Sequence, residues 1–219
     1  MENNLKLRSL LPEVATEFRM LKNNIFMLLG NKESSKSIMV ASSIHQEGTS
    51  TIAKNLSLVS AEDPKVKVLL MDLNFRSPLK ESIRGETKGL SDWFLENGFP
   101  LKSILHQTTV QNLYFLLPGN AKSDPLRMQE SIRFSELLNE LKEDFSCIVI
   151  DSSPLQYYPE SNLLATKVDG VLLVVQAEKT RREIVIDTKT KLNSIHANLL
   201  GVVLNRKKYY IPKIIYNLL

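Results

Sequence analysis

The chain has 219 residues, 43% of them hydrophobic, and a formal net charge of +4. This length suits one α/β domain with a sizeable core. The single cysteine, Cys147, stands in an apolar run, which argues against disulfides and indicates a reduced core residue. No signal-peptide pattern is found, and no apolar run approaches the roughly 20 residues that span a bilayer, so we expect a cytoplasmic protein. The slight basic excess permits contact with an acidic surface, and no nucleic-acid partner is expected.

Short apolar runs alternate with stretches of helical spacing along the chain. The first stretch, Pro12–Leu29, has an apolar stripe that predicts an amphipathic helix. Strands that are apolar throughout and separated by helices predict a doubly wound, mainly parallel α/β sheet with helices on both faces. Residues 1–219 are expected to form a single domain, with a helical segment at 1–30 and a basic, aromatic segment at 206–219. Strands are expected at Ser37–Ser42, Val66–Asp72, Leu113–Leu117, Cys147–Asp151, Val171–Gln176 and Leu199–Asn205, and further helices at Thr49–Ala61, Leu90–Phe94, Ile132–Leu141 and Arg181–Ile195.

The segment from Ser43 to Thr51 reads S-I-H-Q-E-G-T-S-T, a phosphate-binding loop that lacks its lysine. The Walker A pattern ends G-K-[ST], and here Gly48 is followed by Thr49 and Ser50. A strand before this loop and a helix after it would aim free backbone N–H groups and the positive end of the helix dipole at one point. The alternative is an ordinary strand-to-helix turn.

Two aspartates follow apolar strands. Asp72 ends the run Leu69–Met71, and Asp151 ends the run Ile148–Ile150. Function in a parallel sheet gathers at the carboxyl ends of its strands, and an aspartate there is typical of a Walker B carboxylate beside Mg²⁺. Alternatively Asp151 caps the following turn, because Asp-Ser-Ser-Pro is a favourable turn sequence.

These residues together resemble the bacterial tyrosine kinases of capsule and exopolysaccharide synthesis, the CpsD/CapB type of deviant-Walker P-loop ATPases. The resemblance covers nearly the whole chain. The stretch Thr16–Ile25 also resembles the family's ring-assembly helix, which implies self-association through Arg19 and Lys22. The matching positions are Ser42, Glu47, Gly48, Ser50 and Thr51 in Walker A, Leu69, Leu70, Asp72, Arg76 and Pro78 in Walker A′, and Val149, Ile150, Asp151 and Pro154 in Walker B.

The resemblance implies a set of functional residues. It makes Asp72 and Asp151 catalytic if the enzyme is active, and the cofactor ATP or ADP with Mg²⁺. It also implies a membrane chain-length or adaptor protein of polysaccharide export as partner, which would hold the chain at the inner face of the cell membrane. The nucleotide-binding residues would be Glu47, Gly48, Thr49, Ser50, Thr51 and Asn205, and the Mg²⁺ ligands Ser50, Asp72 and Asp151.

Several positions depart from the family pattern. Thr49 replaces the Walker A lysine, Gln46 the preceding glycine, and Asn74 the second Walker A′ acid, while Thr16 stands where an oligomerisation glutamate belongs. Losing one charge-stabilising contact of this kind costs about 100- to 1000-fold in rate. The sequence therefore predicts a kinase-like domain with weak or absent phosphotransfer and reduced nucleotide affinity.

Two questions stay open. Tyr209, Tyr210 and Tyr216 near the end could be packing groups of a terminal helix, part of a membrane or adaptor contact, or phosphate acceptors. The alternative function is a nucleotide-dependent ATPase switch of the partitioning or positioning type that docks on membrane. Such switches use an additional P-loop lysine, and this loop contains none.

Overall fold

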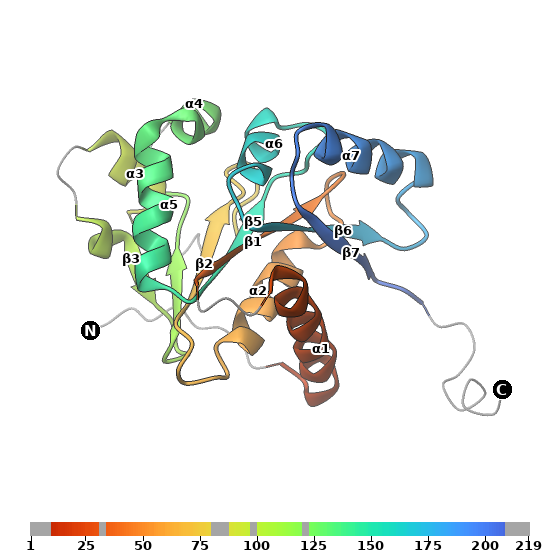
Figure 1. The fold of residues 1–219 in the computed structure, drawn as a ribbon, viewed down its shortest axis with the longest axis horizontal. Coiled ribbons are helices and arrows are strands. Elements are labelled where there is room, and N and C mark those ends of the chain that lie inside the picture. The colour runs from red at the N-terminus through yellow and green to blue at the C-terminus, as the bar shows by residue number, and fades with distance from the viewer. Residues whose placement is uncertain (1–9, 31–33, 80–87, 97–99, 120–122, 209–219) are drawn as a thin grey trace.

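The computed structural model describes residues 10–30, 34–79, 88–96, 100–119 and 123–208. Its centre is a seven-stranded sheet with the order β3-β4-β2-β5-β1-β6-β7 (Figure 1). The pairings are parallel except between β3 and β4. The predicted doubly wound, mainly parallel α/β fold is therefore confirmed. The strands are β1 (Lys36–Ser42), β2 (Val68–Leu73), β3 (Leu105–Gln107), β4 (Leu113–Leu116), β5 (Cys147–Ser152), β6 (Gly170–Gln176) and β7 (Leu199–Asn205).

Helices cover both faces of the sheet (Figure 1). One face is covered by α1 (Pro12–Leu29) and α2 (Thr49–Ser60), whose apolar residues share a buried cluster with the sheet. A second cluster fills the opposite face. The elements on that side are α3 (Leu90–Leu95), the short 3₁₀ helix η2 (Leu101–Ile104), α4 (Pro125–Glu130), α5 (Ile132–Asp144), α6 (Pro159–Ala165) and α7 (Arg182–Ser194).

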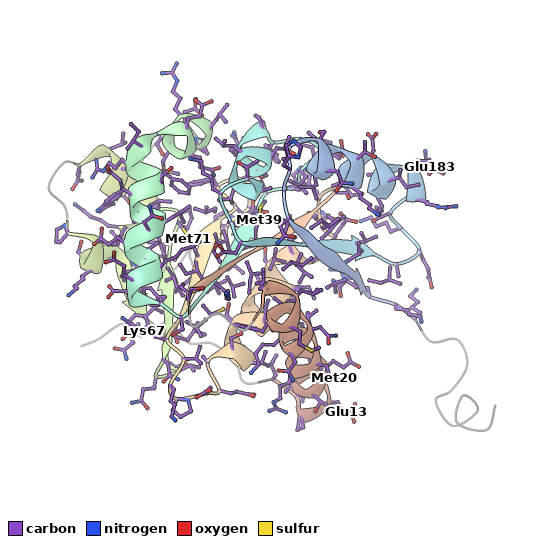
Figure 2. The ribbon with its side chains drawn as sticks, viewed as in Figure 1. Glu13, Met20, Met39, Lys67, Met71 and Glu183 are labelled. Carbon is purple, nitrogen blue, oxygen red and sulfur yellow. The ribbon has the colours of Figure 1, made fainter. Side chains whose placement is uncertain are left out.

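The central strands are apolar throughout because both of their faces are buried. In β1, Ile38 and Val40 face the α1/α2 side, whereas Met39 and Ala41 face the other side. Figure 2 shows Met39 and its β2 counterpart Met71 inside the molecule. This packing aligns the parallel strands so that their carboxyl ends meet at one edge of the sheet.

Besides the four-residue 3₁₀ helix η2, three elements were not anticipated. Strand β3 has only three residues and pairs antiparallel with β4, too short a run to produce a hydrophobic pattern. Helices α4 and α6 are six and seven residues long. Both begin with proline at the first helical position, and the Asp124 side chain accepts a bond from the Leu126 N–H to start α4.

Two sequence expectations concern the core and membrane crossing. Cys147 is a free, buried thiol, and burial raises its pKa to about 12 against a smaller opposing effect of Ser60. Among the described residues, no helix combines the length and apolar composition needed to cross a bilayer.

Candidate functional site

The loop between β1 and α2 ends at Gly48, whose left-handed backbone conformation would strain any residue with a side chain. Gly48 has φ +99°, and a Cβ there would lie 2.2 Å from Asn205 Nδ2. It occupies the N-cap position of α2, so no side chain caps the helix. The first backbone N–H groups of α2 are thus left for a ligand, which makes this helix end suitable for a phosphate.

Glu47 braces this loop against the neighbouring strand. Its buried carboxylate accepts hydrogen bonds from the Ile44 N–H at 2.8 Å and the Gln176 N–H at 3.2 Å. The Thr180 hydroxyl donates to the same carboxylate. The Glu47 side chain therefore binds the protein itself, and what it offers a nucleotide is its main chain. Its bracing role was missed by sequence reasoning, since two of the donors lie at the end of β6 and beyond it.

Asn205 ties the end of β7 to the same loop. Its Nδ2 donates to the Glu47 carbonyl at 2.8 Å, and its Oδ1 accepts from the Arg206 N–H at 2.9 Å. Asn205, which the resemblance implies as a nucleotide-binding residue, thus lies directly beside the phosphate-binding loop. Its side chain also fixes the conformation of that loop.

The loop carries backbone strain at Gln46. This residue has φ +66°, in the left-handed region, although it stands where the family pattern has glycine. A side chain in that conformation costs about 1–2 kcal/mol. The loop shape has therefore been kept without the residue type that adopts it most easily.

Asp72 and Asp151 lie side by side at the carboxyl edge of the sheet. They are register partners in the parallel pair β2 and β5, and both are fully buried. Asp72 accepts hydrogen bonds from the Asn74 N–H at 3.0 Å and the Leu79 N–H at 2.8 Å. Neither oxygen of Asp151 makes a well-formed hydrogen bond with the described residues. The two carboxylates are thus brought together, and one of them lacks a well-formed hydrogen bond among the described residues.

Burial, followed by the neighbouring Asp72 carboxylate, raises the pKa of Asp151 well above its ordinary value. The Ser50 hydroxyl and the Ser152 main chain favour the charged form more weakly. A buried carboxylate that makes no well-formed hydrogen bond, beside a second carboxylate and a serine hydroxyl, matches the oxygen ligands that Mg²⁺ prefers. The residues present therefore fit the implied Mg²⁺.

Thr49, Ser50 and Thr51 form the first turn of α2. Thr49 is 8% exposed and is neutral, so the position of the Walker A lysine supplies no charge. Arg76 is directed elsewhere: its guanidinium lies over the Tyr158 ring at 5.4 Å from the centroid and 3.9 Å from Glu160 Oε1. The Arg76 side chain therefore points toward the start of α6.

Asn74 has a structural role that sequence reasoning missed. Its Oδ1 accepts from the Ser77 N–H and from the Ser153 hydroxyl, each at 3.2 Å. The amide thus connects the turn after β2 to the turn after β5. Asn74, which replaces an acid in the family pattern, therefore holds together the two turns that follow the aspartate-bearing strands.

An aromatic cluster flanks the loop. His45 stacks on Tyr157 with ring centroids 5.1 Å apart, and its Nε2 lies 3.4 Å from the Tyr158 hydroxyl. These tyrosines follow β5 in the sequence. No spacing rule links a loop histidine to aromatic residues more than 100 positions later, so the pattern gave no signal for this cluster.

The charged residues of α1 that were expected to support self-association contact their own chain. Arg19 forms a two-bond ion pair with Glu62, with N–O distances of 2.7 and 2.8 Å, and Lys22 Nζ donates to the Val59 carbonyl at 3.5 Å. The outer surface of α1 carries exposed Met20, labelled in Figure 2, and Met27. The three C-terminal tyrosines lie outside the described residues.

Comparisons with known proteins address the resemblance directly. No protein-family model matches the chain. The tyrosine-protein kinase YwqD of Bacillus subtilis is 28% identical over 202 residues, covering 88% of this chain and 81% of YwqD. The crystal structure of the chimerical protein CapA2B2 has a TM-score of 0.80 at 25% identity and covers 95% of this chain and 96% of its own. The VpsO kinase domain has a TM-score of 0.78 at 29% identity, with coverage of 90% and 97%.

The resemblance to bacterial tyrosine kinases is confirmed. The cell-division ATPase MinD of Pyrococcus furiosus is a more distant neighbour, with a TM-score of 0.64 at 21% identity, and shares the P-loop ATPase fold. The segments that resemble the kinases' Walker A, A′ and B motifs lie at the carboxyl ends of β1, β2 and β5. The parallel pairing of these three strands brings the segments to one edge of the sheet.

Proposed function

We propose that this chain is a tyrosine-kinase-like regulator that binds Mg-nucleotide and has weak or absent phosphotransfer activity. The similarity to tyrosine-protein kinases supports the kinase ancestry. The observation that carries the proposal is Asp151, a fully buried carboxylate beside Asp72 that makes no well-formed hydrogen bond with the described residues. A fold retains such an unfavourable charge where a ligand neutralises it.

The ligand-binding residues follow from the geometry. Backbone N–H groups of Gly48, Thr49, Ser50 and Thr51 would hold the phosphates at the start of α2. The Ser50 hydroxyl with Asp72 and Asp151 would hold Mg²⁺, which when bound neutralises phosphate charge. Asn205 lies next to the loop, where it would contact the base or sugar.

The same residues account for weak transfer. Phosphoryl transfer depends on positioning and on neutralising developing charge, and removing one such contact costs about 3–4 kcal/mol. Thr49 provides no charge, and Arg76 is engaged with Tyr158 and Glu160. Asn74 replaces a carboxylate with an amide whose oxygen is already occupied. Binding relies on backbone groups and on the two aspartates, so it persists at reduced affinity.

The biological setting extends the resemblance. The chain would act as a single cytoplasmic domain at the inner face of the membrane, through a membrane chain-length or adaptor protein, and would regulate polymerisation or export of capsule or exopolysaccharide. Self-association through α1 would use its exposed side, because Arg19 contacts Glu62 just beyond α2 and Lys22 contacts Val59 of α2. Co-purification with such an adaptor supports this setting, whereas ATP-dependent binding to protein-free liposomes favours the ATPase switch.

A fluorescent nucleotide titration tests the proposal. We expect saturable binding to the wild-type chain in the presence of Mg²⁺ and weaker binding when EDTA replaces the metal. Asp151→Asn should remove the Mg²⁺ dependence, while Asp187→Asn, a change of the same chemistry on exposed α7, should leave it intact. Absence of saturable binding to the wild-type chain would refute the proposal.

A further inference from the structure

A cavity lies at the edge of the sheet opposite to the phosphate-binding loop, where the strands begin. Its volume is 360 Å³, and it is formed by the second half of α1, the end of α2 and the segments entering β1, β2 and β5. Helix α2 has twelve residues and begins at the loop, so at about 1.5 Å per residue its far end lies about 18 Å away. The lining includes Lys22, Phe26, Lys36, Ser60, Asp63 and Ser146.

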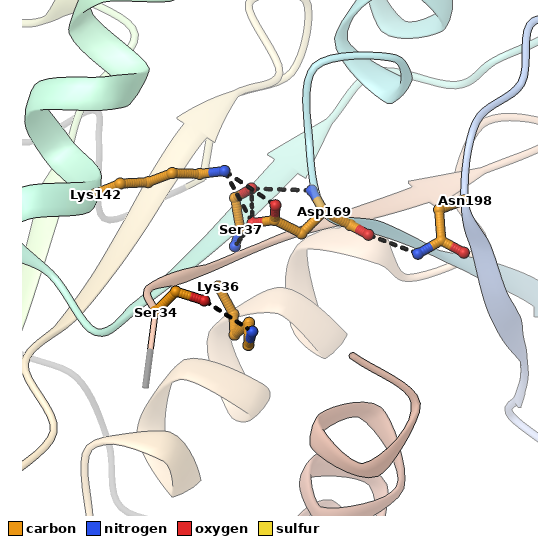
Figure 3. Close-up of polar contacts among 6 residues, drawn as sticks. All are labelled: Ser34, Lys36, Ser37, Lys142, Asp169 and Asn198. Atoms are coloured by element: carbon orange, nitrogen blue, oxygen red, sulfur yellow. Dashed lines mark hydrogen bonds and ion pairs between the residues drawn. The ribbon is translucent and has the colours of Figure 1, made fainter. Parts of the chain in front are cut away.

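Lys36 brings a positive charge into this cavity. It is 6% exposed, and its Nζ contacts the Ser34 hydroxyl at 3.2 Å (Figure 3). No carboxylate of the described residues forms an ion pair with it. A buried ammonium without a counter-ion is costly, because its lost hydration is not replaced.

The next residue, Ser37, belongs to a polar network on the other face of the sheet, where a lysine has a carboxylate partner. Strand alternation turns Ser37 to the opposite face, where its hydroxyl donates to Asp169 at 2.7 Å (Figure 3). Lys142 completes that network with an ion pair to Asp169 at 2.9 Å. The lysine on that face has a carboxylate partner, whereas Lys36 faces the cavity without one among the described residues.

Other donors converge on the cavity. Lys22 also lines it, and its Nζ donates a long hydrogen bond of 3.5 Å to the Val59 carbonyl. The Ser60 hydroxyl is buried beside the thiol of Cys147, a weak hydrogen-bonding group, and has no other polar partner in the described chain. Asp63 is the one acid among the described lining residues, and its Oδ1 accepts from the Lys65 N–H at 3.0 Å.

We propose that this cavity binds a small organic phosphate. Lys22 and Lys36 would hold the phosphate, and Phe26 with Val66 would contact an apolar body. Among the described lining residues, two ammonium groups stand against one carboxylate, and this net positive charge favours an anion. The volume lies at the small end of ligand pockets, which suits a compact molecule. This site is separate from the phosphate-binding loop and does not depend on the function proposed for that loop.

Phenyl phosphate combines both features and is the probe. Amide chemical-shift mapping on the 219-residue chain, in EDTA, should give saturable changes at residues 22–30, 34–36 and 60–66. Lys36→Met should weaken binding about tenfold or more, as expected for loss of a charge-assisted contact. Lys65→Met removes the same charge from an exposed neighbouring position and should bind like the wild type. Lys22→Met provides a second test if Lys36→Met fails to fold.

Three results would overturn the proposal. Shift changes confined to residues 44–51 would place the phosphate at the loop instead. Equal affinity of the wild-type, Lys36→Met and Lys22→Met chains would show that the cavity lysines do not bind the anion. Equally tight binding of benzoate would remove the assignment of phosphate as the recognised group. Inorganic phosphate should bind more weakly than phenyl phosphate, because it cannot use the apolar wall.

Discussion

Replacing Asp151 with asparagine should stabilise the ligand-free protein. The carboxylate is fully buried, lies beside Asp72 on the neighbouring strand and has no well-formed hydrogen bond with the described residues. A buried polar group without a partner costs about 1–3 kcal/mol, and more when it is charged. We therefore expect Asp151→Asn to add about 2 kcal/mol to the free energy of unfolding. For a chain of this size, 1 kcal/mol shifts Tm by about 2–4 °C, so Tm should rise by about 4–8 °C.

The gain should depend on pH in a defined direction. The folded-state pKa of Asp151 is raised above its ordinary value of 3.8, so ionisation costs stability as pH rises through the raised pKa. The advantage of Asp151→Asn should increase as pH rises above about 4, so it should be larger at pH 8 than at pH 4. Thermal unfolding followed by circular dichroism in EDTA measures both. Asp72→Asn is the matched control and should destabilise, because Asp72 accepts two backbone N–H groups. An unchanged or lower Tm for Asp151→Asn at pH 8, or a pH-independent gain, would refute the reasoning.

Three further substitutions test the loop. Thr49→Lys should raise ATPase or autokinase activity, by up to about 100- to 1000-fold if the missing charge is the main lesion; background activity with nucleotide bound would place the lesion elsewhere. Glu47→Ala should lower the free energy of unfolding by about 2–3 kcal/mol in urea titration, because it leaves buried donors unpaired, and a neutral effect would contradict the bracing role. Gln46→Gly should raise stability in the same assay by about 0.5–1 kcal/mol, since glycine accepts φ +66° without strain, and a loss would show that its side chain is needed.

Local pattern was enough to predict the fold and to place the aspartates. The central strand β1 is a run of seven buried residues, and such a run between helices implies a parallel sheet. The same pattern placed Asp72 and Asp151 at the carboxyl ends of two strands, and the structure shows that these strands are neighbours. The three-residue strand β3 carries no such pattern and was missed.

Contacts between distant parts of the chain explain what could not be predicted. The Glu47 carboxylate accepts from Gln176, 129 positions later, and the Glu47 carbonyl accepts from Asn205, 158 positions later. Whether a loop acid that matches the Walker A pattern contacts a ligand or a neighbouring strand depends on tertiary packing, which local sequence rules do not describe. The same holds for Asn74, which reads as a lost acid and in the structure joins two turns.

The central claim is that this site retains nucleotide while transferring little phosphate. Native mass spectrometry of the purified chain after incubation with MgATP, followed by denaturing mass measurement, tests both halves at once. The account predicts one nucleotide per chain in the native spectrum and no covalent phosphate after denaturation. A chain without nucleotide would contradict the binding claim, and a chain carrying stoichiometric phosphate would contradict the claim that Thr49 and Asn74 leave transfer weak.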